Sequence, residues 1–282
     1  MKTSKVIAAP TSLLKKRVAV IGMGKIGTIL IQSMLKAGLL SKEQIRATVQ
    51  HPDKARTLRK DLGFQVGTNN LDAAEGADII LICVKPQQVG QVLEQLAPIT
   101  TPAQLIVSVA ASVSTDYMEQ RLPTNNPIIR AMPNTPSMIG CGMTALCKGR
   151  FADQSHVDLT RALFDTVGRT VVVDEKHMDA VTGLSASGPA FIYIIVESLA
   201  EAGVKVGLPR DVATLLAAQT TMGAARVVLE TGHHPALLKD AVTTPAGCTI
   251  DGILELEEGK LRVTLIKAVV KAAQRAKELV FS

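Results

Sequence analysis

The chain has 282 residues, of which 47% are hydrophobic, and a formal net charge of +6. This length suits two domains, and the apolar content is enough to bury a core in each of them. The positive charge forms no dense basic cluster and only 2% of the residues are aromatic, so a nucleic-acid-binding protein is not expected.

The first 16 residues are basic, contain no acid and lack a long apolar centre. We expect a flexible tail here and no secretory signal, with an organellar targeting peptide as the alternative. No apolar stretch is expected to cross a membrane, because Glu197 interrupts the most apolar one. The four cysteines form no CxxC pair, which indicates free thiols in a reducing compartment and hence a cytoplasmic location. We expect no metal site, since His233 and His234 have no second set of ligands and fit a loop before Pro235.

The first half of the chain alternates short apolar runs with amphipathic stretches. A buried strand is expected at residues 17–22, followed by a helix over residues 25–36 with its apolar residues on one side. Strands rich in β-branched residues that alternate with helices are typical of a largely parallel sheet covered on both faces. The fold class is therefore α/β, with a Rossmann-type doubly wound sheet over residues 17–174. Further strands are expected at residues 45–50, 78–84, 104–110, 127–132, 143–147 and 170–174.

The pattern changes after Asp174, where strand-like runs cease and apolar residues recur at helical spacing as far as Phe281. We expect residues 175–282 to form an all-α domain. One of its helices is apolar around much of its circumference, so the domain is expected to mediate self-association as a dimer or larger oligomer. A compact monomeric bundle is the alternative. The long helices are expected at residues 188–203, 211–230 and 261–279.

Three glycines follow the first expected strand in GxGxxG spacing: Gly22, Gly24 and Gly27. The first makes the turn, the second lets a pyrophosphate approach the backbone, and the third lets helix and strand pack. The helix that opens there supplies free N–H groups and a positive dipole end. In the first strand-to-helix turn of a doubly wound domain, this motif predicts a dinucleotide-binding segment made of Gly22, Met23, Gly24, Lys25, Ile26 and Gly27.

The end of the second expected strand indicates which dinucleotide is bound. An NADH enzyme would place an acid there to hold the ribose diol, but this strand ends at Gln50 and His51 and is followed by Lys54 and Arg56. A 2′-phosphate would be favoured by such surroundings, so the expected cofactor is NADPH, with NADH as the alternative and His51 in contact with it. Alternatively, Lys54 and Arg56 are only a solvated helix face.

Other cofactor contacts are expected at the ends of later strands, where ligands of open α/β sheets collect. Val84, Lys85 and Pro86 follow one strand, and Lys85 is placed to reach the ribose or phosphate of the cofactor, although a plain surface lysine would look the same. The next strands end in small residues and prolines, over residues 107–113 and 130–136, which would admit a flat nicotinamide ring.

Two segments of the helical region carry a resemblance to a known family. They are "GLSASGPAF" at residues 183–191 and "KDAVTTPAGCTIDGILELEE" at residues 239–258. Together with "VKP" and "MPNTP", they make the chain from Arg17 onward resemble the Δ1-pyrroline-5-carboxylate reductases. It departs from that family at Ala246 and Ala186, where glycine is common, which bears on loop geometry and substrate range.

The resemblance implies an NAD(P)H-dependent oxidoreductase that reduces the cyclic imine 1-pyrroline-5-carboxylate to L-proline, the last step of proline biosynthesis. It places the substrate carboxylate at Gly247, Cys248 and Thr249, with Thr244 beside it. It also places the nicotinamide between Ala110–Ala111 and Asn134, and Asn70 and Lys85 toward the adenosine ribose.

The chemistry of these residues agrees with that reaction. Backbone N–H groups at a helix N-terminus hold a carboxylate without a bulky side chain, and "AGCT" is such a turn. The Thr249 hydroxyl is the candidate catalytic group, because it would hydrogen-bond the imine nitrogen and assist its protonation. Cys248 is interpreted as a small filler, since hydride reduction needs no nucleophile. The alternatives are a related imine or 2-hydroxyacid oxidoreductase, and a non-catalytic dinucleotide-sensing module.

Overall fold

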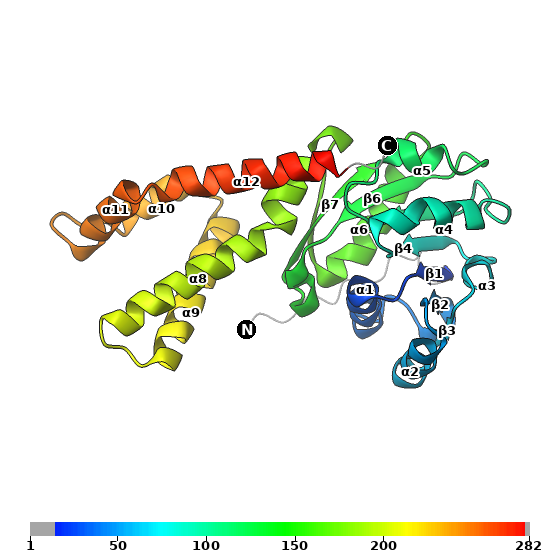
Figure 1. Cartoon of the computed structure of the whole chain (residues 1–282), viewed down its shortest axis with the longest axis horizontal. Helices are drawn as coiled ribbons and strands as arrows, with labels where there is room; N and C mark the ends of the chain where they lie inside the picture. Colours follow the sequence, from blue (N-terminus) through cyan, green and yellow to red (C-terminus); the bar gives the residue numbers. More distant parts are fainter. Residues whose placement is uncertain (1–14, 280–282) are drawn as a thin grey trace. The chain divides into compact units, whose positions relative to one another are not determined.

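The structure, a computed structural model, describes residues 15–279 of the chain. The expected tail therefore lies outside the described residues except for Lys15 and Lys16. The chain forms two compact units (Figure 1). The α/β unit holds residues 15–186 and 272–279, and the helical unit holds Ser187–Lys271. The expected domain boundary after Asp174 stays a prediction.

The α/β unit is built on one eight-stranded sheet, in the order β3-β2-β1-β4-β5-β6-β7-β8. Every neighbouring pair is parallel except β6 and β7, which are antiparallel. The prediction of a doubly wound, largely parallel sheet is thus confirmed. The strands are β1 (Val18–Ile21), β2 (Ile45–Thr48), β3 (Gln65–Gly67), β4 (Ile79–Ile82), β5 (Leu105–Ser108), β6 (Ile128–Met132), β7 (Gly142–Lys148) and β8 (Gly168–Val172).

The central strands are apolar throughout because both of their faces are covered. In β1, Val18 and Val20 belong to one buried cluster, whereas Ala19 and Ile21 belong to another on the opposite face. Helices α1, α2 and α6 contribute to the first cluster, and α3, α4 and α5 to the second. Figure 1 shows the strands between these layers. The helices are α1 (Lys25–Lys36), α2 (Pro52–Leu62), α3 (Asn70–Ala74), α4 (Val89–Leu96), α5 (Thr115–Glu119), α6 (Gln154–Phe164) and α7 (Met178–Val181).

Strand β3 is the strand that was not predicted from the sequence. It has three residues, and of these only Val66 is buried. So short a run carries neither the alternation nor the continuous apolar character that identifies a strand. Its partner β2 supplies the pairing that defines it.

The helical unit contains helices alone, as the sequence predicts. Helices α8 and α9 pack closely where Gly203 faces Ala213, since a Cβ built on Gly203 would lie 2.9 Å from the Cβ of Ala213. Among residues 187–271 only Ala200, Ala213 and Ala217 are buried. The helices are α8 (Gly188–Lys205), α9 (Arg210–Thr231), α10 (Pro235–Ala241), α11 (Cys248–Glu258) and α12 (Leu261–Glu278), whose last turns belong to the α/β unit.

A core of three alanines leaves large apolar side chains of the helical unit in contact with solvent. Ile194 is 62% exposed, Leu215 68% and Ile266 63%. By length and composition alone, Glu175–Lys205 and Arg210–Thr231 are long and apolar enough to cross a membrane. The expectation that no stretch is so apolar was therefore wrong, because it treated a single glutamate as sufficient to interrupt a span. A second copy of the chain would cover the exposed apolar side chains of these helices.

We expect the protein to be at least a dimer. Light scattering at micromolar concentration, without detergent, should return at least twice the chain mass of 29.8 kDa, because the exposed apolar side chains of α8, α9 and α12 need a protein partner in water. A monomer mass under these conditions would contradict the prediction, and Leu215→Glu should shift the mass toward the monomer.

Candidate active site

The turn between β1 and α1 uses its three glycines for different purposes. Gly22 has φ +95°, and a Cβ there would lie 2.7 Å from Cγ1 of Val84. A Cβ on Gly27 would lie 2.9 Å from the carbonyl oxygen of Gly22. Gly24 differs, because a Cβ there would meet nothing within 4 Å. The fold itself requires Gly22 and Gly27, whereas the open side of Gly24 is free for a ligand.

The N–H groups of this turn divide into occupied and free ones. Gly22 and Met23 donate to the carbonyl oxygen of Thr48, and Gly24 donates to that of Gly22. The first N–H groups of helix α1, on Lys25, Ile26 and Gly27, have no acceptor within the helix. The helix N-cap has no side-chain hydrogen bond, and the first turn contains no acid. This end of α1 therefore suits an anion such as a pyrophosphate.

A cavity of about 460 Å³ opens beside the turn. This volume is within the range of ligand-binding cavities. Among the residues predicted from the sequence, it brings together Gly22, Met23, Gly24, His51, Asn70, Val84 and Lys85. The lining also includes Thr48, Gln50, Lys54, Gln88, Gln91 and Gln95, of which Thr48, Gln88, Gln91 and Gln95 were missed in the sequence analysis.

The basic residues after β2 have different surroundings. Lys54 lines the cavity, and His51 forms the N-cap of α2 at its edge. Arg56 forms an ion pair with Asp53 on the exposed face of α2. A cation for a 2′-phosphate is thus available at Lys54, and no acid is among the residues that line this cavity.

Asn70 is held in one orientation by a chain of hydrogen bonds. The Thr48 hydroxyl accepts from the N–H of Gly22 at 3.3 Å and donates to Oδ1 of Asn70 at 2.8 Å. Nδ2 of Asn70 then donates to Oε1 of Gln95 at 3.0 Å. One Nδ2 hydrogen of Asn70 remains for a ligand. Sequence reasoning had no signal for Thr48 or Gln95, because their partners lie 22 and 25 residues away.

The residues expected at the nicotinamide are at the ends of β5 and β6. Ala110 is buried, and Ala111 packs against a small cluster that contains Met132 and Met178. Asn134 donates from Nδ2 to the carbonyl oxygen of Ser185 at 3.2 Å and accepts the N–H of Met143 at 2.9 Å. Its amide thus fixes the loop after β6. Pro86 begins the short 3-10 helix Pro86–Gln88 after β4.

The turn expected at the substrate carboxylate lies between α10 and α11. The N–H of Gly247 donates to the carbonyl oxygen of Thr244 at 3.1 Å, and a Cβ on Gly247 would lie 2.4 Å from Oγ1 of Thr244. Ala246 has φ +56°, a left-handed conformation that costs a non-glycine residue about 1 kcal/mol. The departure from the family's usual glycine therefore keeps the turn at the cost of backbone strain.

Helix α11 begins at Cys248 with Gly247 as its N-cap and no side-chain cap. Because the N–H of Gly247 is occupied, the free N–H groups are those of Cys248 and Thr249. Within residues 15–279, no hydrogen bond involves the hydroxyl of Thr249 or that of Thr244. Asp251 also lies in the first turn, so the positive end of this helix is partly offset.

The cysteines and histidines of the described residues form no metal site. All four cysteines are free thiols. Residues 15–279 contain no group of three or more His, Cys, Asp or Glu side chains placed to hold a metal ion. Burial raises the pKa of Cys83, beneath the β1–α1 turn, to about 12, so this thiol stays neutral.

Family models match both units of the chain. Residues 175–279 match the family model for pyrroline-5-carboxylate reductase dimerisation, and residues 17–112 match the model for coenzyme F420-dependent NADP oxidoreductases. The dimerisation model supports self-association through the helices.

Relatives and solved structures cover nearly the whole chain. The pyrroline-5-carboxylate reductase of Methanosarcina acetivorans is 40% identical over 94% of this chain and 98% of its own, and that of Glycine max is 41% identical over 92% and 94%. The reductase structure from Coxiella burnetii has a TM-score of 0.88 at 35% identity and covers 95% of this chain and 99% of that one. The NADP-bound Plasmodium falciparum pyrroline carboxylate reductase has a TM-score of 0.85 at 28% identity, covering 95% and 100%. The chain belongs to the pyrroline-5-carboxylate reductase family.

Proposed function

We propose that this protein reduces 1-pyrroline-5-carboxylate to L-proline with NADPH. The observation that carries the proposal is the match, along nearly the full length of both chains, to relatives named for this reaction. The two turns agree with it, because one leaves open space beside Gly24 and the other leaves free N–H groups at Cys248 and Thr249.

The cofactor would be held mainly by the β1–α1 turn. The N–H groups of Lys25, Ile26 and Gly27 would bind its pyrophosphate, and the open side of Gly24 would leave room for it, while Met23 fixes the turn through Thr48. When bound, NADPH supplies the hydride. Other contacts are assigned to the adenosine ribose and its 2′-phosphate, from His51, Lys54, Asn70, Val84, Lys85 and Pro86.

The nicotinamide ring is assigned to the space bounded by Ala110, Ala111 and Asn134. Two alanines leave room for a flat ring, and the bonded amide of Asn134 keeps the loop after β6 from closing over it. The small side chains position the ring by shape, and the buried side of Ala110 is already filled by the core.

The substrate is assigned to the turn before α11. The N–H groups of Cys248 and Thr249 hold its carboxylate, while Gly247 keeps the turn tight against Thr244. The Thr249 hydroxyl would donate a hydrogen bond to the lone pair that develops on the nitrogen of the protonated imine as the ring carbon receives the hydride. The product is a secondary amine, so no strong acid is required.

The remaining assignments concern the surroundings of the enzyme. We assign residues 17–174 to the dinucleotide-binding domain and residues 175–282 to the substrate-binding and dimerisation domain. Its partners are the small-molecule substrate and other copies of the chain, without nucleic acid or membrane, and its location is the cytoplasm. The free cysteines are consistent with a reducing compartment.

The proposal is tested by incubating the purified protein with NADPH and pyrroline-5-carboxylate. We expect oxidation of NADPH with stoichiometric release of proline, and a higher kcat/KM with NADPH than with NADH because Lys54 lines the cavity beside the β1–α1 turn. A folded protein that releases no proline at saturating substrate would refute the function. Equal kcat/KM values for the two cofactors would refute the assigned role of Lys54.

The glycines of the β1–α1 turn should separate cofactor binding from folding. Gly24→Ala should change the free energy of unfolding by less than about 0.5 kcal/mol, since its Cβ meets nothing. It should nevertheless raise the Kd for NADPH about tenfold or more, because the Cβ occupies the path of the pyrophosphate. Gly27→Ala should lower the free energy of unfolding by about 1–3 kcal/mol through contact with Gly22. Fluorescence titration and chemical denaturation measure the two effects, and unchanged NADPH affinity in Gly24→Ala would contradict the assignment.

Substitutions at the start of α11 should show which side chain hydrogen-bonds the nitrogen of the substrate. Thr249→Ala should lower kcat about ten- to a hundredfold and affect KM less, because its hydrogen bond strengthens as the nitrogen becomes an amine. Loss of one such bond is worth about 1–3 kcal/mol. Thr249→Ser should recover most of the activity, and Cys248→Ala, which keeps the backbone N–H, should be nearly silent. An active Thr249→Ala with an inactive Cys248→Ala would mean that the thiol performs the chemistry.

A further inference from the structure

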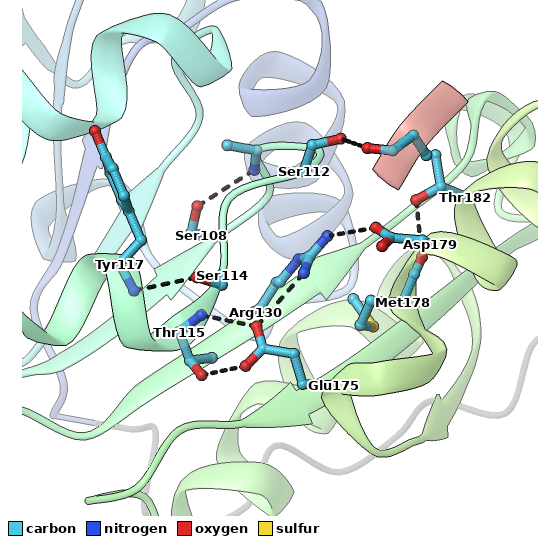
Figure 2. Close-up of polar contacts among 12 residues, drawn as sticks. Ser108, Ser112, Ser114, Thr115, Tyr117, Arg130, Glu175, Met178, Asp179 and Thr182 are labelled. Atoms are coloured by element: carbon cyan, nitrogen blue, oxygen red, sulfur yellow. Dashed lines mark hydrogen bonds and ion pairs between the residues drawn. The ribbon is translucent and has the colours of Figure 1, made fainter. Parts of the chain in front are cut away.

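A buried arginine on β6 lies beside two carboxylates (Figure 2). The side chain of Arg130 is 5% exposed, whereas those of Glu175 and Asp179 are partly exposed. Nη1 of Arg130 lies 3.4 Å from Oε1 of Glu175, and Nη2 lies 3.9 Å from Oδ1 of Asp179. A buried guanidinium needs such partners, since an unpaired charge in the interior is strongly destabilising.

Glu175 makes further contacts that Asp179 does not make. Its Oε1 accepts the backbone N–H of Thr115 at 2.7 Å, and its Oε2 accepts the hydroxyl of Thr115 (Figure 2). Thr115 is buried and is the first residue of α5. One carboxylate therefore joins the start of α5 to the middle of β6, although Thr115 and Arg130 precede it in the sequence by 60 and 45 residues.

The two joined segments are those assigned to the nicotinamide. Thr115 follows Ala110 and Ala111 by a few residues, and Arg130 precedes Asn134 on the next strand. Strands β5 and β6 are paired, with Ser108 opposite Arg130. The spacing between the loop after β5 and the loop after β6 thus depends on what holds Thr115 and Arg130 together, and Glu175 contacts both.

The charge of Glu175 also affects the neighbouring strand β7. Cys147 pairs with Arg130 on the neighbouring strand β7. Burial, and next the negative charge of Glu175, raise the pKa of the Cys147 thiol to about 12. Nε and Nη2 of Arg130 have no hydrogen-bond partner among the described residues. The hydrogen-bonded contact of Arg130 with a side chain is therefore the one to Glu175.

We propose that Glu175 is a positioning residue for hydride transfer, which holds the loops after β5 and β6 at the spacing that the nicotinamide ring requires. The proposal rests on the proposed function, because it uses the placement of the ring between Ala110–Ala111 and Asn134. Glu175 touches neither cofactor nor substrate in this account. It acts through Thr115 and Arg130.

Two substitutions distinguish the link between Glu175 and Thr115 from the neutralisation of the buried Arg130 charge. Thr115→Pro removes both donors to Glu175 and leaves the Arg130–Glu175 ion pair intact. Proline is favoured at the first position of a helix, and the preceding Ser114, with φ −75° and ψ 159°, has the extended conformation that a following proline needs. Asp179→Asn removes the negative charge of the second carboxylate that faces Arg130, and it leaves the link between Glu175 and Thr115 intact.

The measurements are kcat, the deuterium isotope effect with NADPH labelled at C4 of the nicotinamide, and the Kd for NADPH. For Thr115→Pro we expect kcat to fall about ten- to a hundredfold with a larger isotope effect, because a small displacement of the ring slows the hydride step. Its Kd for NADPH should stay within about threefold, because the pyrophosphate and ribose contacts are intact. Asp179→Asn should keep kcat within about twofold, whatever its effect on the melting temperature.

A third variant tests whether geometry or charge is responsible. Glu175→Gln keeps one oxygen to accept from Thr115 N–H and Arg130, and its amide nitrogen can donate to the Thr115 hydroxyl. It should therefore retain most of the wild-type kcat. A Glu175→Gln variant as slow as Thr115→Pro would overturn the proposal, because the charge of Glu175 would then matter more than the link.

Hydrogen exchange gives a readout that does not depend on turnover. In the absence of NADPH, exchange over residues 108–117 should be faster in Thr115→Pro than in Asp179→Asn, with other segments of the α/β unit unchanged. Equal exchange there in the two variants, a wild-type kcat in Thr115→Pro, or an equal loss of kcat in Asp179→Asn would each overturn the proposal. A wild-type protein that releases no proline would refute the proposed function, and the exchange comparison would still decide whether Glu175 holds the loop.

Discussion

In a parallel sheet, the carboxyl ends of neighbouring strands lie at the same edge. The candidate active site of the α/β unit depends on that constraint. Strands β1, β4, β5 and β6 are parallel neighbours. Their carboxyl ends deliver the glycine turn, Lys85, Ala110 and Asn134 to the same edge. Each of these strands is buried along its length, so a slip in register would expose buried residues. The core therefore sets the register of the site.

Backbone strain occurs in two of the segments that the proposed function uses. Among the described residues, three residues other than glycine have positive φ: Ser112, Ala246 and Lys260. Ser112 follows the two alanines assigned to the nicotinamide, and its hydroxyl donates to the carbonyl oxygen of Ala276 at 2.9 Å (Figure 2). Ala246 forms the turn before α11 and has no comparable bond. The first strained residue is held by tertiary contact, and the second by the tight Thr244–Gly247 turn alone.

The sequence predicted the parts of this structure that follow from local chemistry. The strands around β1 are apolar runs, and the glycine spacing directly after the first strand identifies the β1–α1 turn. The contacts of Thr48, Gln95 and Glu175 could not be predicted, because each joins residues that only the folded sheet brings together. The helices α8 and α9 were predicted, but the length of their apolar stretches was underestimated. The reason is that a single charged residue, Glu197, was treated as sufficient to interrupt such a stretch. Family resemblance, more than spacing, pointed to Thr249, whose neighbours carry no chemical signature of their own.

The polar side chains near the two turns divide by whether the fold already occupies them. Thr48, Thr115 and Asn134 are bonded within the protein, so they fix loops and have little capacity left for a ligand. The hydroxyl of Thr249 has no bond within residues 15–279, although the residue is only partly exposed. That hydroxyl is not among the buried unpaired polar atoms of residues 15–279, so a ligand can reach it and hydrogen-bond to it. A substrate nitrogen would do so without any rearrangement of the turn, and a weakly acidic hydroxyl is sufficient where the imine brings its own proton. Under the proposed function, the occupied groups of the sheet position the loops, and the free hydroxyl at the start of α11 hydrogen-bonds the substrate nitrogen.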